Sequence, residues 1–188
     1  MPGLSIFQSE RLVLRAIEPE DIPTLHTYLN HPDLNGRRYL PGHFPEDIPL
    51  SKKQVEKAYE MLSQEEDGFH LAVTLRESQK MIGHASCDWG WDPYCPGMSL
   101  VISPSRHRQG YGSEVMEILL EYLFERTLAH NVSMWIADWN RAGREFAKKN
   151  GFQEIGRWRR VGKLNGAFFD TIVVDILRPE WVRKSEAG

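Results

Sequence analysis

The pattern of hydrophobic and polar positions along the chain predicts strands and helices in alternation. Residues 11–17 alternate polar and apolar side chains, as a half-buried strand does. Apolar residues at helical spacing predict helices at about 19–30, after Ser51, at 113–125 and at 141–150. Further strands are predicted at 69–75, 80–89, 98–102, 132–137, 155–161 and 168–176. The order β-α-α-β-β-β-α-β-α-β-β predicts an α/β (α+β) fold, in which helices lie on the faces of a mixed sheet.

The composition of the 188-residue chain indicates a single soluble globular domain over 1–188. Hydrophobic residues make up 41% and charged residues 26%, which excludes a disordered chain. No apolar run approaches the length of a membrane span, and no secretory signal is visible, so we expect a cytoplasmic protein without a membrane partner. Cys87 and Cys95 are too few for a disulfide framework, and no CxxC or HExxH motif suggests a metal.

The charge is unevenly distributed along the chain. The net charge of −3 argues against nucleic-acid binding. Residues 1–67 carry 12 acidic and 7 basic side chains, whereas residues 131–188 carry 7 acidic and 11 basic ones. An acidic first third suits a cationic substrate and a basic last third suits a phosphorylated ligand; the alternative is that both are solvated surfaces.

The segment 101–114 carries the most informative chemistry. It joins a predicted strand to a predicted helix, so its backbone N–H groups converge on the positive end of the helix dipole and form an anion site. Gly110 and Gly112 let the backbone approach a ligand closely, and Arg106 and Arg108 add positive charge. Neither a P-loop motif nor a dinucleotide-binding GxGxxG motif is present.

This segment and the one that follows it resemble the GNAT superfamily of acetyl-CoA-dependent N-acetyltransferases. The family loop reads Arg/Gln-x-x-Gly-x-Gly/Ala, and residues 107–112 read His-Arg-Gln-Gly-Tyr-Gly, so both glycines match and His107 departs. Asn140 and a helix that ends in Asn150-Gly151-Phe152 resemble the next family segment. The resemblance extends over about 8–182 and is closest to the branch of ribosomal-protein and polyamine acetyltransferases.

The resemblance implies a sheet of about seven strands, splayed between 98–102 and 132–138, with about four helices. Acetyl-CoA as cosubstrate would place its pantetheine arm in the gap and its pyrophosphate on the glycine loop. At Asn140 the alternatives are coenzyme binding and helix capping, which Asn does well. The implied coenzyme-binding residues are Val101, Ile102, Ser103, His107, Arg108, Gln109, Gly110, Tyr111, Gly112, Ser113 and Asn140.

The side chains that many relatives use for proton transfer are absent. Where they have a Glu, a Tyr and a Ser, this chain has Gly97, Ala147 and Gly143. On the strand before the loop, His84, Ser86 and Asp88 alternate with apolar residues and therefore share one face. That face can line an amine pocket, with Asp88 or His84 receiving a proton through water; the alternative is a polar face open to solvent.

Two other features surround the expected cleft. The stretch 31–50 contains four prolines and little periodicity, as a binding loop or lid does. Four tryptophans can form aromatic walls for an amine or serve packing alone; they are Trp89, Trp91, Trp135 and Trp139.

These observations predict an N-acetyltransferase that moves an acetyl group from acetyl-CoA to a primary amine by direct attack. A protein N-terminus, a polyamine and another small amine all remain open as acceptors. The alternative is a non-catalytic acyl-CoA-binding module, because three expected proton-transfer groups are missing. No metal is expected, and a homodimer is compatible with the resemblance.

Overall fold

A computed structural model describes residues 7–37, 48–64, 66–90 and 92–187 of the chain. These residues form one seven-stranded sheet of order β1-β2-β3-β4-β5-β7-β6. The strands are β1 (Leu12–Ala16), β2 (Gly68–Leu75), β3 (Met81–Asp88), β4 (Gly97–Ile102), β5 (Asn131–Ala137), β6 (Gln153–Leu164) and β7 (Ala167–Leu177). The helices are α1 (Ile22–Leu29), α2 (Lys52–Ser63), α3 (Tyr111–Arg126), α4 (Arg141–Lys149) and α5 (Arg178–Ala187), with 3-10 turns η1 (Pro19–Asp21), η2 (Pro32–Leu34) and η3 (Pro104–Arg106).

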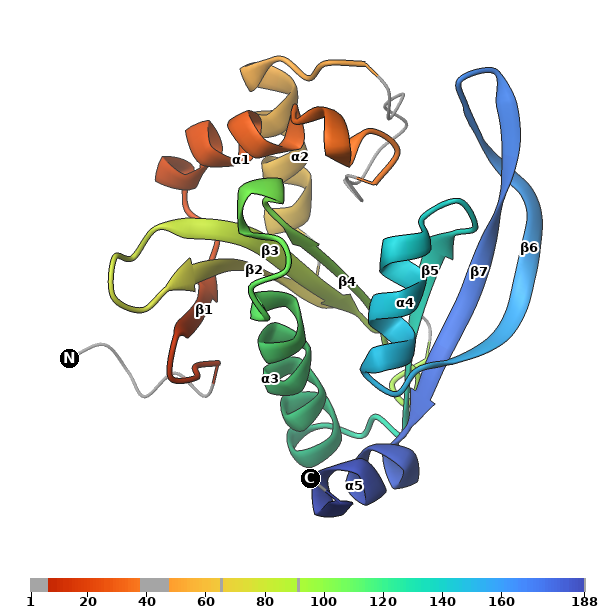
Figure 1. Ribbon diagram of the computed structural model, residues 1–188. Helices are drawn as coiled ribbons and strands as arrows, with labels where there is room; N and C mark the ends of the chain where they lie inside the picture. The colour runs from red at the N-terminus through yellow and green to blue at the C-terminus, as the bar shows by residue number, and fades with distance from the viewer. Residues whose placement is uncertain (1–6, 38–47, 65, 91, 188) are drawn as a thin grey trace.

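The sheet is splayed between β4 and β5, as expected. These two strands are parallel and pair at one position, Gly97 with Ser133, whereas β3 and β4 pair antiparallel along their length. β4 and β5 therefore separate toward their carboxyl ends, where Figure 1 shows the gap between them.

The helices cover the two faces of the sheet unequally. On one face, α3 and α4 pack on the larger core, which includes the fully buried Leu119 and Phe124. On the other face, α1 and α2 cover the β1–β4 half through Leu29 and Val55 (Figure 1). Trp135 of β5 lies on the part of the sheet beyond these helices and is 40% exposed.

Local sequence explains where several elements begin and end. Ser51 caps α2 in a capping box with Gln54, as the sequence predicts for Ser51. Gly151 follows α4 with a φ of 97°, the left-handed conformation that glycine tolerates best. Asn165 and Gly166 both have positive φ and join β6 to β7 in a tight turn.

One helix and one helix boundary differ from the expectation. α5 is a fifth helix, which the sequence pattern missed because no regular apolar stripe marks it; Trp181 packs against Phe124 with ring centroids 5.6 Å apart. α3 begins at Tyr111 rather than at 113, because its first turn is polar and contains a glycine. Of the expected lid over 31–50, residues 38–47 lie outside the described residues.

No helix in the described part of the chain is long and apolar enough to cross a membrane.

Candidate functional site

The loop between β4 and α3 presents backbone N–H groups at a helix N-terminus. Gly110 is the N-cap of α3 and has a φ of 86°, so the chain reverses there before the helix begins. No side chain caps this end, and the amides of the first helical turn have no acceptor within the helix. Amides so arranged, at the positive end of a 16-residue helix, suit an anion such as a pyrophosphate.

His107, the residue that departs from the family loop, serves the loop itself. Its Nε2 lies 2.8 Å from the carbonyl oxygen of Ile102, and since a carbonyl only accepts, Nε2 carries the proton. The side chain therefore ties the loop to the end of β4. Arg108 is exposed and Arg106 is half-buried beside it, and both supply positive charge.

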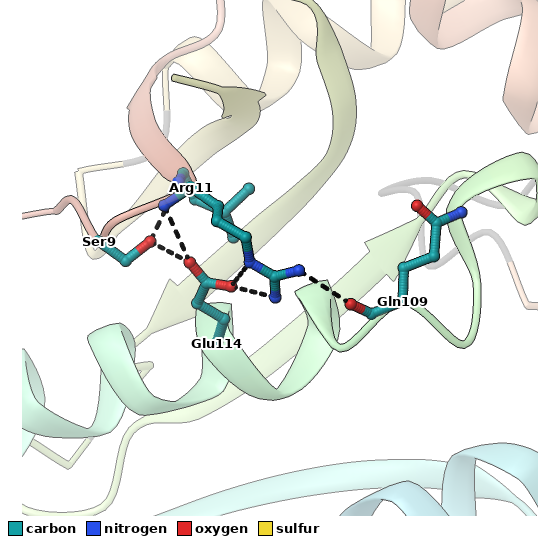
Figure 2. Close-up of polar contacts among 5 residues, drawn as sticks. Ser9, Arg11, Gln109 and Glu114 are labelled. Atoms are coloured by element: carbon teal, nitrogen blue, oxygen red, sulfur yellow. Dashed lines mark hydrogen bonds and ion pairs between the residues drawn. The ribbon is translucent and has the colours of Figure 1, made fainter. Parts of the chain in front are cut away.

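A clamp of three residues, Ser9, Arg11 and Glu114, holds the start of α3 (Figure 2). Arg11 donates from Nε to Glu114 Oε2 at 2.8 Å and from Nη1 to the Gln109 carbonyl at 3.1 Å, while Ser9 donates to Glu114 Oε1. The Arg11 guanidinium also lies 4.6 Å from the centroid of the Tyr111 ring. Sequence reasoning missed this clamp, because no motif links an N-terminal arginine to a carboxylate 103 residues away.

Electrostatics keep the clamp ionised. Burial by itself raises the pKa of the Glu114 carboxyl, but the hydrogen bonds from Ser9 and Arg11 outweigh burial and hold the pKa below its ordinary value. Glu114 is therefore a carboxylate at neutral pH and accepts from both partners.

The strand amides of β4 are not equally available. The Ser103 N–H donates to the Ile82 carbonyl at 2.8 Å, so it is already used, contrary to the expectation that it is free. Because N–H groups alternate in direction along a strand, the Val101 N–H also points toward β3 and the Ile102 N–H points toward the splay. Of these three residues, Ile102 offers the amide to a ligand in the gap.

Asn140 caps α4, as one of its two expected roles required. Its Oδ1 accepts from the Gly143 N–H at 3.1 Å and from Arg37 Nη1 at 3.2 Å, and the side chain is buried. Arg37 belongs to the segment after η2, so this contact joins the α1 side of the molecule to α4. No sequence motif indicates this contact.

His84 is buried and does not line an open pocket, which corrects the expectation for this residue. Its Nδ1 lies 2.7 Å from the Tyr28 hydroxyl of α1. Burial, with a smaller contribution from the charge of His70, lowers the pKa of His84 to about 4. A neutral, weakly basic and enclosed imidazole is poorly suited to take a proton from an amine.

Asp88 is the member of the expected polar face that is exposed. The Ser86 hydroxyl is bonded to that of Ser99 at 2.6 Å. Asp88 pairs with Gly97, and a Cβ built on Gly97 would stand 3.2 Å from Asp88 Oδ2 and 2.8 Å from the Trp135 ring. The Asp88 carboxylate and an aromatic ring therefore border the position where many relatives have a Glu.

Metal-ligating side chains do not gather in the part of the chain that the structure describes: no three His, Cys, Asp or Glu residues stand close enough to share an ion. The groups at the site are backbone amides, arginines, one exposed carboxylate and aromatic rings.

The sequence matches known proteins over most of its length. The model of the acetyltransferase (GNAT) domain family matches residues 11–153. An uncharacterized N-acetyltransferase of Bacillus subtilis, YoaA, is 24% identical over 184 residues, which cover 93% of this chain and 97% of the relative.

Solved structures share the fold. Spermidine N-acetyltransferase from Vibrio cholerae, in complex with CoA and spermine, is 18% identical, with a TM-score of 0.77 over 93% of this chain and 99% of that one. An acetyltransferase of the GNAT family from Bacillus anthracis is 19% identical, with a TM-score of 0.78 over 93% and 99%.

Proposed function

Because the chain belongs to the GNAT acetyltransferase domain family, we propose that this acyltransferase moves an acetyl group from acetyl-CoA to a primary amine. The observation that carries the proposal is the N-terminus of α3, where the amides that follow Gly110 have no side-chain cap and follow two arginines in the chain, Arg106 and Arg108. The CoA complex of the Vibrio cholerae neighbour supports the same ligand here.

The amides position the coenzyme, and the gap between β4 and β5 receives its acyl end. The pyrophosphate accepts hydrogen bonds from the first turn of α3, and the pantetheine arm accepts one from the Ile102 N–H. Asn140 presents its side-chain amide from the other side of the gap while its oxygen caps α4.

Direct transfer then needs a neutral amine. The amine nitrogen attacks the thioester carbonyl, the C–N bond forms, the C–S bond breaks, and the thiolate takes up a proton. Asp88 accepts the proton of the attacking amine through water, because its carboxylate borders Gly97. Ala147 offers no acid, so water returns the proton to the thiolate.

The proposal is tested by thiol release from acetyl-CoA with a panel of amines: spermidine, a monoamine, an amino acid and short peptides. We expect turnover with at least one acceptor in the presence of EDTA. Binding of acetyl-CoA without turnover across the whole panel would instead favour a non-catalytic acyl-CoA-binding module.

A further inference from the structure

A contact between residues 36–37 and residues 139–140 crosses the mouth of the splayed sheet. Gly97 is level with Ser133, so four residues further along each strand Val101 is level with Ala137. The turn at 139–140 therefore stands level with the end of β4. Arg37 reaches it from the α1 side and donates to Asn140 Oδ1 at 3.2 Å.

Two hydrogen-bond donors in this contact have no acceptor. Among the described residues, three buried side-chain nitrogens lack a hydrogen-bond partner, and two of them are Arg37 Nε and Trp139 Nε1. A Cβ built on Gly36 would stand 2.7 Å from Trp139 Cζ2, the ring atom next to the carbon that bears Nε1. Both nitrogens thus belong to one contact, where an oxygen acceptor would satisfy them.

Arg37 brings a positive charge to this contact, and Asp138 immediately precedes Trp139 in the chain. Arg37 forms no ion pair with a carboxylate in the described part of the chain; its Nη2 donates to the Asp33 carbonyl instead. Leu164, at the tip of the β6–β7 hairpin, would lie 3.3 Å from a Cβ on Gly36, so the hairpin also borders the contact. β6 carries four cationic side chains, of which Arg157 forms an ion pair with Asp170 of β7 at 3.2 Å. They are Arg157, Arg159, Arg160 and Lys163, against the acidic Glu154 of the same strand.

From these observations we infer that the acceptor amine carries a carbonyl or carboxylate oxygen close to its nitrogen, and that Arg37 and Trp139 bind that oxygen. This rests on the proposed function and names its substrate class: an amino acid or the N-terminal residue of a peptide. A polyamine has no oxygen for the two donors, and the charge of Arg37 disfavours its further cationic nitrogens.

Arg37 and Trp139 then have defined roles in binding the acceptor. The acceptor oxygen inserts between the guanidinium and the indole at the mouth, with its amine directed down the gap toward the thioester. Asp88 is level with Gly97, deeper in the gap, so a chain of water molecules connects it to this amine. A carboxylate gains the charge of Arg37 as well as the two hydrogen bonds, whereas a peptide carbonyl gains the hydrogen bonds alone. Binding of a free amino acid therefore depends on the charge of Arg37 more strongly than binding of a peptide does.

The test compares acceptors and two conservative variants. Rates are measured for alanine, an alanine-led tripeptide amide and spermidine, and are expressed per neutral amine, since an α-amino group has a lower pKa than an alkylamine. Trp139→Phe keeps the ring and removes only the unpartnered N–H. Arg37→Lys keeps the charge but removes Nε together with the Nη donors to Asn140 and Asp33. Trp158→Phe, on the exposed part of β6, is the control.

We expect both alanine-led acceptors to exceed spermidine in kcat/KM. Trp139→Phe raises the KM of the carbonyl-bearing acceptors about tenfold, as the loss of one well-placed hydrogen bond does, and leaves the KM for spermidine unchanged. Arg37→Lys has a similar effect, smaller for alanine than for the tripeptide amide because the charge remains. Trp158→Phe changes none of these constants.

Two outcomes overturn the inference and leave the proposed function standing: spermidine is the best acceptor, or both variants reduce the use of all acceptors equally. No thiol release with any amine would overturn the proposed function. In that case, calorimetry measures the binding of alanine and of the tripeptide amide to the CoA complexes of the parent and of Trp139→Phe. The inference fails if the variant binds both ligands like the parent.

Discussion

At the scale of single residues, Asp88 is the group whose position bears most directly on proton transfer. Its carboxylate is exposed and borders the space beside Gly97, where a larger side chain would collide with Trp135. Asp88→Asn keeps the shape and removes the base, so kcat/KM should fall about 10²-fold. The measurement is a pH profile of kcat/KM, which bends at the pKa of the carboxyl in the parent and rises steadily in the variant.

The control for Asp88 is Glu77→Gln, which removes an exposed carboxylate in the turn between β2 and β3. It should leave the profile unchanged. If Asp88→Asn also leaves the profile unchanged, Asp88 has no part in the mechanism and solvent alone removes the proton.

Asn140 has two roles that one substitution can separate. Asn140→Asp keeps an oxygen for the Gly143 N–H and for Arg37, and its charge suits a helix N-terminus, so stability should be retained. It removes the side-chain N–H that we assign to the coenzyme, and affinity for acetyl-CoA should fall. Asn140→Ala should lose about 1 kcal/mol of stability as well. Thermal unfolding measures the stability and calorimetry measures the affinity for acetyl-CoA. If Asn140→Asp binds acetyl-CoA like the parent, Asn140 only caps α4.

His84 makes stability depend on pH. Its pKa of about 4 in the folded protein is lower than the 6.5 of a free histidine, so the unfolded chain binds more protons between these values. The contribution is fully present above pH 6.5 and is lost as the pH falls toward 4. His84→Gln should therefore flatten the decline of the unfolding midpoint between pH 6.5 and about 4. Equal slopes in the parent and in His84→Gln would contradict this account.

At the scale of elements, the clamp that Ser9, Arg11 and Glu114 form supports the start of α3. Arg11→Met releases the Gln109 carbonyl and the Tyr111 ring, so the loop should bind acetyl-CoA less tightly. Since Arg11 is about half exposed, the loss should be about 1 kcal/mol or less, a few-fold in Kd. Arg157→Met is the matched control, because Arg157 of β6 is about as exposed as Arg11 and its ion pair is with Asp170 rather than with the clamp. Equal Kd values for the two variants would mean that the clamp does not support binding.

The elements themselves could be read from the sequence because most of them bury one face. The alternation in β1 and the helical spacing in α3 place both elements to within two residues. α5 could not be found in this way, since its packing depends on Trp181 meeting Phe124 of a distant helix. The glycine loop was found because it is contiguous. The clamp and the Arg37–Asn140 contact join residues about 100 positions apart, and no local pattern records them.

The two loop glycines also have structural roles that the sequence did not separate from binding. A valine at Gly110 would be strained by the φ of 86°, and a Cβ at Gly112 would stand 3.1 Å from the Phe146 ring of α4. Such variants weaken the fold as well as the anion site. The clamp therefore gives a cleaner test of the loop than either glycine does.

At the scale of the whole molecule, the splay divides the sheet into two halves that meet at few places. β4 and β5 pair at one position, and Arg37 bridges the open end to Asn140. A ligand in the gap contacts both halves at once: the α3 amides and Ile102 on one side and Asn140 on the other. Binding should therefore stabilise the folded chain as a unit rather than one loop of it.

Acetyl-CoA should raise the unfolding temperature of the whole protein without a metal. A ligand that binds only the folded state adds RT ln(1 + [L]/Kd), about 2.7 kcal/mol at a hundredfold excess over Kd. A melting scan with EDTA and millimolar acetyl-CoA measures this, and the transition should remain single because the ligand joins the two halves of the sheet. Desulfo-CoA, which keeps the pyrophosphate, should produce most of the same shift, while acetate should produce none. A melting temperature that acetyl-CoA does not change would refute the assignment of the α3 amides as the coenzyme site.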